Sequence, residues 1–358
     1  MSQEIVRKDI ATIAKNLGEE AKKFEGKTIL MSGGGGFLGK YIIGTLCYLN
    51  DNVFSTPCRI ISVDNYITGA RHPHFNYQNR SDVLEVWADV TYPLPVREDV
   101  HYIINGAGLA SPVYYKKYPL ETIEGTVFGV KNLLELARKN KNNIKGFLFF
   151  SSSEIYGDPD PKAVPTPETY HGYVSSVGPR ACYDESKRLG ETISTIYEQQ
   201  YGVPTTIVRP FNVFGPGMSH NDHRVLPMFA YRALNNESLP VHGDGHQTRT
   251  FCYITDAITG FLLVLLKGQP GHAYNIGNDE NEISMKNLAE LFTSFFDNKI
   301  AYDLISYPEH YPAGEPQRRC PDISKARSDL GFTPRVSLKD GLRQFIEWCK
   351  TDQNYTQN

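Results

Sequence analysis

The feature that most constrains the fold is a repeated alternation of short apolar runs with amphipathic helical patterns. The apolar runs cover residues 27–33, 59–64, 100–106, 144–152 and 204–215, and the helical patterns cover residues 37–50, 122–140 and 182–202. Strands that are apolar at nearly every position are covered on both faces, and strands that alternate with helices pair in parallel. We therefore predict an α/β chain with a Rossmann-type, doubly wound parallel sheet. Ligands of such sheets bind beyond the carboxyl ends of the strands.

The composition argues against several classes of protein. The 358 residues carry a net charge of −3, which gives no basic footprint for binding nucleic acid. No run approaches the roughly 18 apolar residues that a membrane span needs, and the first residues lack the apolar core of a secretory signal. The six cysteines are scattered without a C-x-x-C pair. We therefore expect free thiols, no metal site, no membrane partner and a cytoplasmic location.

A glycine-rich loop follows the first predicted strand and opens the first predicted helix. Gly33, Gly36 and Gly39 have the spacing G-x-x-G-x-x-G, which permits a tight turn and the close approach of a pyrophosphate to the helix N-terminus. The second strand ends at Asp64, where a carboxylate binds ribose hydroxyls and repels a 2′-phosphate. The pattern predicts a dinucleotide site and favours NAD over NADP. The other residues that we expect to contact the cofactor are Phe37, Leu38, Asn65 and Asp89.

Tyr183 and Lys187 lie four residues apart at the start of a predicted helix, so their side chains share one face. A phenol normally titrates near 10, but a lysine ammonium and a cationic nicotinamide nearby favour the phenolate. A tyrosinate can remove a hydroxyl proton while a hydride leaves the same carbon. The pair therefore predicts oxidation of an alcohol next to the cofactor.

Several stretches of the chain together are similar to a known family. They are GGGGFLG at 33–39, SSSEIYGDP at 151–159, GPRACYDESKR at 178–188, RPFNVFGP at 209–216, GDGHQTRTF at 243–251 and RRCPDISKA at 318–326. From about residue 27 to residue 347, the chain resembles the extended short-chain dehydrogenase/reductases, the NAD-dependent sugar epimerase/dehydratase family. Within this family, the motifs most resemble those of the UDP-glucuronate decarboxylases. The resemblance implies a nucleotide sugar, preferably a UDP-sugar, as the substrate.

We divide the chain into three expected regions. Residues 1–25 form an N-terminal amphipathic helix. Residues 26–210 form an NAD-binding Rossmann domain, to which residues 243–268 return. Residues 211–242 and 269–350 form a smaller α/β lobe that binds the nucleotide sugar. The family also implies a homodimer that is formed through the helix carrying Tyr183 and its neighbouring helix.

The resemblance implies further roles for individual residues. Ser152, with Ser153 beside it, hydrogen-bonds the substrate hydroxyl that is oxidised, and Lys187 binds the nicotinamide ribose. Asn212 is expected near the diphosphate of the nucleotide sugar. The arginines that the resemblance implies for the diphosphate or the uridine are Arg224, Arg249 and Arg319.

Glu154 discriminates among the reactions of the family. The 4,6-dehydratases carry Asp-Glu at this place and simple 4-epimerases usually lack the glutamate, whereas this chain has Ser153-Glu154, which resembles the decarboxylases. We therefore expect oxidation of UDP-glucuronate at C4, loss of CO₂, and UDP-xylose or the 4-keto pentose as the product. Thr255 stands where a related bacterial decarboxylase has a basic residue, so either the reprotonating acid or the chemistry differs. The alternatives are a 4-epimerase, a 4,6-dehydratase, and a non-catalytic dinucleotide sensor on the same fold.

Overall fold

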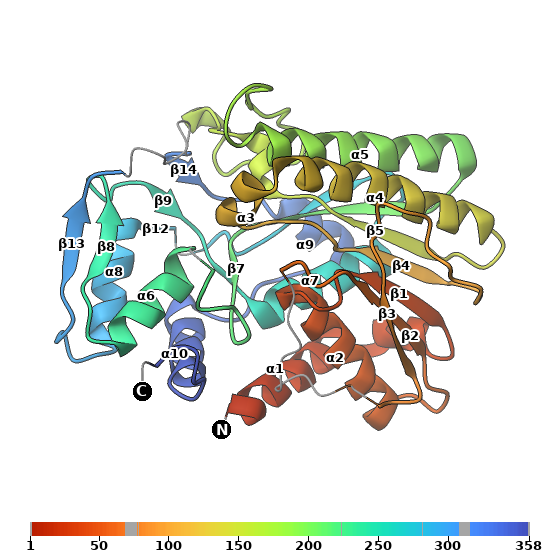
Figure 1. Cartoon of the computed structure of the whole chain (residues 1–358), viewed down its shortest axis with the longest axis horizontal. Coiled ribbons are helices and arrows are strands. Elements are labelled where there is room, and N and C mark those ends of the chain that lie inside the picture. Colours follow the sequence, from red (N-terminus) through yellow and green to blue (C-terminus); the bar gives the residue numbers. More distant parts are fainter. Residues whose placement is uncertain are drawn as a thin grey trace.

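The predicted apolar runs form five strands of one parallel sheet, and β3 and β11, which lie outside those runs, form its two edges (Figure 1). The structure is a computed structural model, and it describes residues 2–68, 77, 79–222, 224–280, 282–307 and 316–356. Within these residues the main sheet has seven strands in the order β11-β6-β5-β4-β1-β2-β3, and every pair is parallel. The strands are β1 (Thr28–Ser32), β2 (Arg59–Asp64), β3 (Val83–Trp87), β4 (Tyr102–Asn105), β5 (Gly146–Phe150), β6 (Thr205–Pro210) and β11 (Ala273–Ile276). The strand order reverses between β1 and β4, so the predicted doubly wound Rossmann-type sheet is confirmed.

Helices cover both faces of this sheet (Figure 1). One face carries α3 (Pro112–Lys117), α4 (Pro119–Lys139) and α5 (Ala181–Tyr201), and the other carries α1 (Ser2–Leu17), α2 (Phe37–Asn52) and α7 (Ile254–Lys267). Successive residues of β5 point to opposite faces: Phe147 and Phe149 join the core beneath α4, while Leu148 and Phe150 join the core beneath α2 and α7. All four side chains are buried. This two-sided burial explains why the strand is apolar at consecutive positions.

The smaller lobe lies beyond the carboxyl ends of the strands, on the left in Figure 1. Its helices are α6 (Val225–Leu234), α8 (Met285–Ser294) and α10 (Leu338–Cys349), whereas α9 (Ser324–Leu330) packs on α7 and β11 of the main-sheet part. Its short strands are β7 (Val213–Phe214), β8 (Leu239–His242), β9 (Thr248–Arg249), β10 (Cys252–Tyr253), β12 (Ile283–Ser284), β13 (Tyr302–Ile305) and β14 (Arg318–Arg319). The 3₁₀ helices are η1 (Gly18–Phe24), η2 (Ser153–Tyr156) and η3 (Pro161–Ala163).

The division between the two parts differs from the expected one at three strands. Residues 243–268 were expected to return to the Rossmann domain, but β9 and β10, within that range, pair with strands of the smaller lobe. We assigned residues 269–350 to the smaller lobe, but β11, within that range, pairs with β6 at the edge of the main sheet. The preceding α7 crosses the face of the sheet and returns the chain for one more parallel strand, as a β-α-β unit does. Four strand residues between two glycine-containing turns are too short a pattern to assign to either sheet from the sequence.

The N-terminal helix α1 is integrated into the molecule through a buried carboxylate. Asp9 accepts hydrogen bonds from the hydroxyl groups of Tyr41 on α2, at 3.0 Å, and of Tyr253 on β10, at 3.1 Å. Burial raises the pKa of Asp9 to about 7, and the two tyrosine hydroxyls oppose this rise. The helix thus connects the glycine-loop helix to the smaller lobe. None of the helices among the described residues is long and apolar enough to cross a membrane.

Candidate active site

A cleft of about 1070 Å³ opens at the carboxyl ends of the main-sheet strands, between the sheet and the smaller lobe. Its walls come from the glycine loop, the segment after β5, the first turn of α5, α6, and the segments around β8, β9 and β14. Most of the residues that the sequence nominated line it. They are Gly33, Gly36, Phe37, Leu38, Gly39, Ser152, Ser153, Glu154, Tyr183, Lys187, Asn212, Arg224, Arg249 and Arg319.

The glycine loop has the geometry that a phosphate-binding turn requires. Gly33 has a φ of +77°, a value that favours glycine, and its N–H donates to the carbonyl of Val63 at 2.8 Å. A Cβ on Gly39 would lie 2.2 Å from the carbonyl oxygen of Gly33, so only glycine lets α2 pack this closely on β1. No side chain caps the N-terminus of α2 at Gly36. The free N–H groups of this first turn fit the pyrophosphate of a dinucleotide.

Asp64, Asn65 and Asp89 are placed differently from the rest of the predicted cofactor residues. Asp64 is the last residue of β2, Asn65 follows it, and Asp89 comes two residues after β3; none of the three is among the described residues that line the cleft. The carboxylate of Asp64 accepts hydrogen bonds from the backbone N–H of Gly35 at 2.8 Å and of Tyr66 at 2.7 Å. Asn65 donates to Asp89 at 3.1 Å. In this structure Asp64 therefore holds the glycine loop against β2, a role that the sequence analysis did not foresee.

The segment after β5 turns its hydroxyl groups into the cleft. Ser152 is the N-cap of η2, and its hydroxyl accepts the backbone N–H of Glu154 at 3.2 Å. Ser151, Ser152 and Ser153 are all at least nine-tenths buried. A short 3₁₀ helix begins here because the serine side chain satisfies the first free N–H group of the turn. This capping places Glu154 at the edge of the cleft rather than in solvent.

Tyr183 and Lys187 lie together in the first turns of α5, as their spacing predicted. The ammonium of Lys187 donates to the carbonyl of Phe150 at 2.7 Å and lies 5.7 Å from the centre of the Tyr183 ring. Burial lowers the pKa of Lys187 to about 8, and Glu191 opposes this change. Burial raises the pKa of the Tyr183 phenol, and a hydrogen bond with Ser152 opposes the rise. Because burial dominates, the predicted lowering of the tyrosine pKa depends on the positive charge of an oxidised nicotinamide.

Glu154 forms the centre of a charged cluster in the wall of the cleft. Its carboxylate pairs with both terminal nitrogens of Arg319, at 2.5 and 2.9 Å, and with Arg180. Arg180 also lies 3.5 Å from the carboxylate of Asp184, whose pKa is raised by burial. Arg319 is thus placed at Glu154, although the resemblance assigned it to the diphosphate or the uridine. The sequence did not lead us to predict a role for Arg180. Its position three residues before Tyr183 was the one feature that could have indicated that it lies at the site.

The other predicted substrate-binding residues also line the cleft. Asn212 has a φ of +37°, and its side-chain amide donates to the carbonyl of Thr250 at 2.8 Å. Arg249 is buried on β9 and donates to the carbonyl of Thr248 at 2.8 Å. Arg224 pairs with Asp222 just before α6. Thr255, the residue that departs from the bacterial relative, is buried in α7 and does not line the cleft within the described part of the chain.

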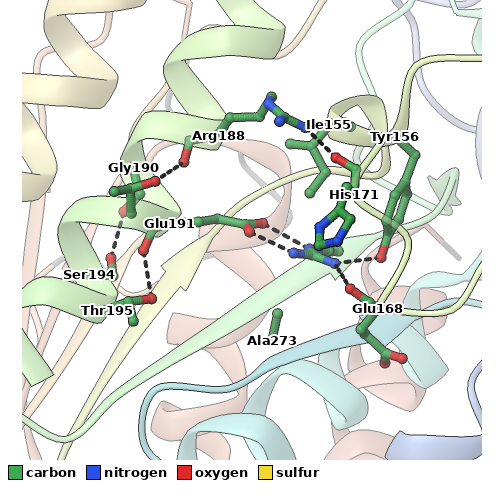
Figure 2. Close-up of polar contacts among 12 residues, drawn as sticks. Ile155, Tyr156, Glu168, His171, Arg188, Gly190, Glu191, Ser194, Thr195 and Ala273 are labelled. Carbon is green, nitrogen blue, oxygen red and sulfur yellow. Dashed lines mark hydrogen bonds and ion pairs between the residues drawn. The ribbon is translucent and has the colours of Figure 1, made fainter. Parts of the chain in front are cut away.

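A buried polar network connects the segments that carry Glu154 and Lys187, and Figure 2 shows the part of it between Glu191 and Tyr156. Arg209, on β6, donates two hydrogen bonds to Glu191 of α5, at 2.9 and 2.7 Å, and a third to the hydroxyl of Tyr156 at 2.7 Å. That hydroxyl donates to the side-chain carbonyl of Asn275 at 2.8 Å. The side-chain amide of Asn275 in turn donates to the carbonyl of Asp322, three residues after Arg319, at 3.0 Å. The network therefore joins the three segments that carry Glu154, Lys187 and Arg319.

Comparisons with known proteins agree with this architecture. The model of the NAD dependent epimerase/dehydratase family matches residues 29–277. UDP-glucuronic acid decarboxylase 3 of Arabidopsis thaliana is 38% identical over 338 residues, which cover 92% of this chain and 91% of the relative. UDP-glucuronic acid decarboxylase 1 of Xenopus tropicalis is 35% identical over 332 residues, covering 93% and 74%. A dTDP-glucose 4,6-dehydratase from Streptomyces venezuelae, solved with NAD bound, has a TM-score of 0.80 over 92% of this chain and 99% of that one, at 22% identity. That last likeness concerns the fold alone.

Proposed function

The chain belongs to the NAD dependent epimerase/dehydratase family, and we propose that it is an NAD-dependent enzyme that decarboxylates UDP-glucuronate through a 4-keto intermediate. NAD, the cofactor named for this family, is also the cofactor that the glycine loop and Asp64 predicted from the sequence. The product is UDP-xylose if the 4-keto group is reduced before release, and the 4-keto pentose if it is not. The substrate class follows the names of the decarboxylases that are 35–38% identical to this chain.

The observation that carries this proposal is the cluster around Glu154. Two guanidinium groups, of Arg180 and Arg319, share this one carboxylate at the wall of the cleft. Two guanidinium groups therefore lie at this wall of the cleft, and groups of this kind bind a carboxylate such as that of a uronate through paired hydrogen bonds. Position 153, where a dehydratase carries an aspartate to protonate the leaving hydroxyl, is a serine. Its hydroxyl is too weak an acid to replace that carboxyl group in the elimination of water.

The side chains of the site have separate tasks in this reaction. A bound NAD would supply the hydride acceptor for C4 of the sugar and, in its reduced form, the hydride donor for the later reduction at C4. Tyr183 takes the proton of the C4 hydroxyl, Ser152 hydrogen-bonds the same oxygen, and the Lys187 ammonium favours the phenolate by its charge. The resulting β-keto acid loses CO₂, and the electron pair of the broken bond passes into an enolate whose oxygen accepts hydrogen bonds from Tyr183 and Ser152. Glu154 and its arginines orient the sugar ring, and a proton returns to C5.

Mass spectrometry of the products tests this function directly. The purified protein, supplied with NAD, should convert UDP-glucuronate to a product that has lost CO₂, without net formation of NADH if UDP-xylose is released. A product of unchanged mass would identify an epimerase, and a product that had lost water would identify a dehydratase. Either result, or the absence of CO₂ release under all conditions, would overturn the proposal. NAD binding without turnover of any nucleotide sugar would instead favour the dinucleotide sensor.

We also propose that the enzyme is a homodimer that is formed through α4 and α5. These two helices pack side by side on the outer face of the sheet (Figure 1). They expose large apolar side chains to solvent, which are Leu120, Ile123 and Phe128 on α4 and Leu189 and Ile196 on α5. A two-fold axis would bury this surface against the same surface of a second copy, giving a four-helix contact. Light scattering should give a dimer mass, and Phe128→Asp should reduce it to that of the monomer.

A further inference from the structure

Lys40 is a buried cation in the wall of the cofactor side of the cleft. It follows Gly39 in the first turn of α2, where its backbone N–H donates to the carbonyl of Gly36 at 3.1 Å. Only 6% of the residue is exposed, and it lines the cleft together with the glycine loop. The lysine is thus in the turn whose free N–H groups face a bound pyrophosphate.

The ammonium group of Lys40 has no hydrogen bond or ion pair among the residues that the structure describes. Asp64 acts on it only through its charge, and both oxygens of that carboxylate already accept backbone N–H groups of Gly35 and Tyr66. Burial lowers the pKa of Lys40 to about 8. A buried lysine without a partner is costly, so the position is suited to a ligand that brings negative charge.

The distribution of charge along the cleft indicates which ligand this is. Of the described residues between 31 and 110 that line the cleft, Lys40 is the only lysine or arginine. The arginines of the cleft belong to the sugar side, where two pair with Glu154 and one with Asp222. A bound dinucleotide and a nucleotide sugar bring two separate diphosphate groups. Among the described cleft-lining residues from 31 to 110, Lys40 is therefore the one cationic side chain that can join the helix N-terminus in binding the cofactor diphosphate.

We propose that the Lys40 ammonium forms an ion pair with the pyrophosphate of the bound dinucleotide, an inference that rests on the proposed NAD-dependent function. The pairing supplies the missing counter-charge and keeps the lysine protonated in the complex. It makes Lys40 a cofactor-binding residue that the glycine spacing alone does not reveal.

Calorimetric titration with fragments of the cofactor tests this inference. ADP carries the pyrophosphate, and adenosine lacks it. Lys40→Met keeps the length of the buried chain and removes its charge, so it should weaken ADP and NAD binding about tenfold to a hundredfold and leave adenosine binding unchanged. Lys40→Arg restores the charge and should recover most of the affinity. The affinity of the natural protein for ADP should also fall as the pH rises above about 8, while that of Lys40→Arg should not.

Three outcomes would overturn the inference. Unchanged ADP affinity in Lys40→Met would show that the ammonium does not reach the pyrophosphate. An equal loss for adenosine would show damage to the fold, which thermal unfolding of the same variant would register. A loss seen only for adenosine 2′,5′-bisphosphate would place the ammonium at the ribose instead. Because ADP binding requires no sugar, each of these results leaves the decarboxylase proposal to be judged by its own product assay.

Discussion

Replacing Glu191 with Gln removes one partner of the buried ion pair behind the active site. Arg209 donates two hydrogen bonds to this carboxylate, and the exposed fractions of the two side chains are only 10% and 13%. The variant keeps the shape and one acceptor oxygen but leaves a buried guanidinium without its counter-charge. Breaking a buried pair in this way costs about 3–5 kcal/mol of the free energy of unfolding. The loss should appear in urea unfolding as a lower midpoint.

The same substitution should also change catalysis through Lys187. Glu191 lies one helical turn beyond this lysine, and its negative charge opposes the effect of burial, which lowers the pKa of Lys187 to about 8. Without that charge the pKa falls further. Lys187 acts in its protonated form, so activity is present below this pKa and is lost as the pH rises through it. The basic limb of the kcat profile should therefore move to lower pH in Glu191→Gln.

Two further variants separate the effects on stability and on catalysis. Glu185→Gln, on the same helix, removes an exposed ion pair with Arg188 and should change stability by less than about 1 kcal/mol, with no shift of the profile. The double variant Glu191→Gln with Arg209→Met removes both buried charges, so it should recover much of the stability and still show the displaced basic limb. A profile that stayed in place while stability fell would refute the argument that Glu191 tunes Lys187 and would leave it a structural residue.

The other predictions concern three single substitutions. Tyr183→Phe removes the base, so kcat should fall about 10²- to 10⁴-fold while the NAD content of the purified protein is unchanged, and persistent turnover would disprove the assignment. Glu154→Gln removes the carboxylate that Arg180 and Arg319 share and with it the ion pairs that orient the two guanidinium groups, so kcat should fall at least about tenfold without a rise in KM for UDP-glucuronate; an unchanged kcat would contradict its proposed role. Asp9 has its pKa raised from 3.8 to about 7, so its contribution to stability is complete below pH 3.8 and is lost as the pH rises to about 7. Asp9→Asn should abolish this part of the decline, and identical slopes of stability against pH in both proteins would argue against a buried protonated carboxyl.

Local patterns in the sequence were sufficient to predict the main sheet. The run from Phe147 to Phe150 indicated a strand buried on both faces, and the two cores that share it confirm that prediction. The glycine loop could also be predicted, because each of its glycines is required by a backbone constraint that involves residues only a few positions away. The assignment of β11 to the main sheet could not be predicted, because the apolar pattern of four residues is too short to indicate which sheet they join.

What the sequence by itself determined is the sheet, the cofactor loop, and the pairing of Tyr183 with Lys187, since all of these depend on residues close together in the chain. Only the tertiary structure decided which charges meet. Arg319 lies 165 residues from Glu154 and yet pairs with it, Arg209 is buried against Glu191, and Lys40 has no partner among the described residues. Such pairings depend on how distant segments are packed together, and no periodicity in the chain records them. Burying a charge without a partner is unfavourable. For this reason a buried charge that lacks a protein partner indicates a place where a charged ligand can bind.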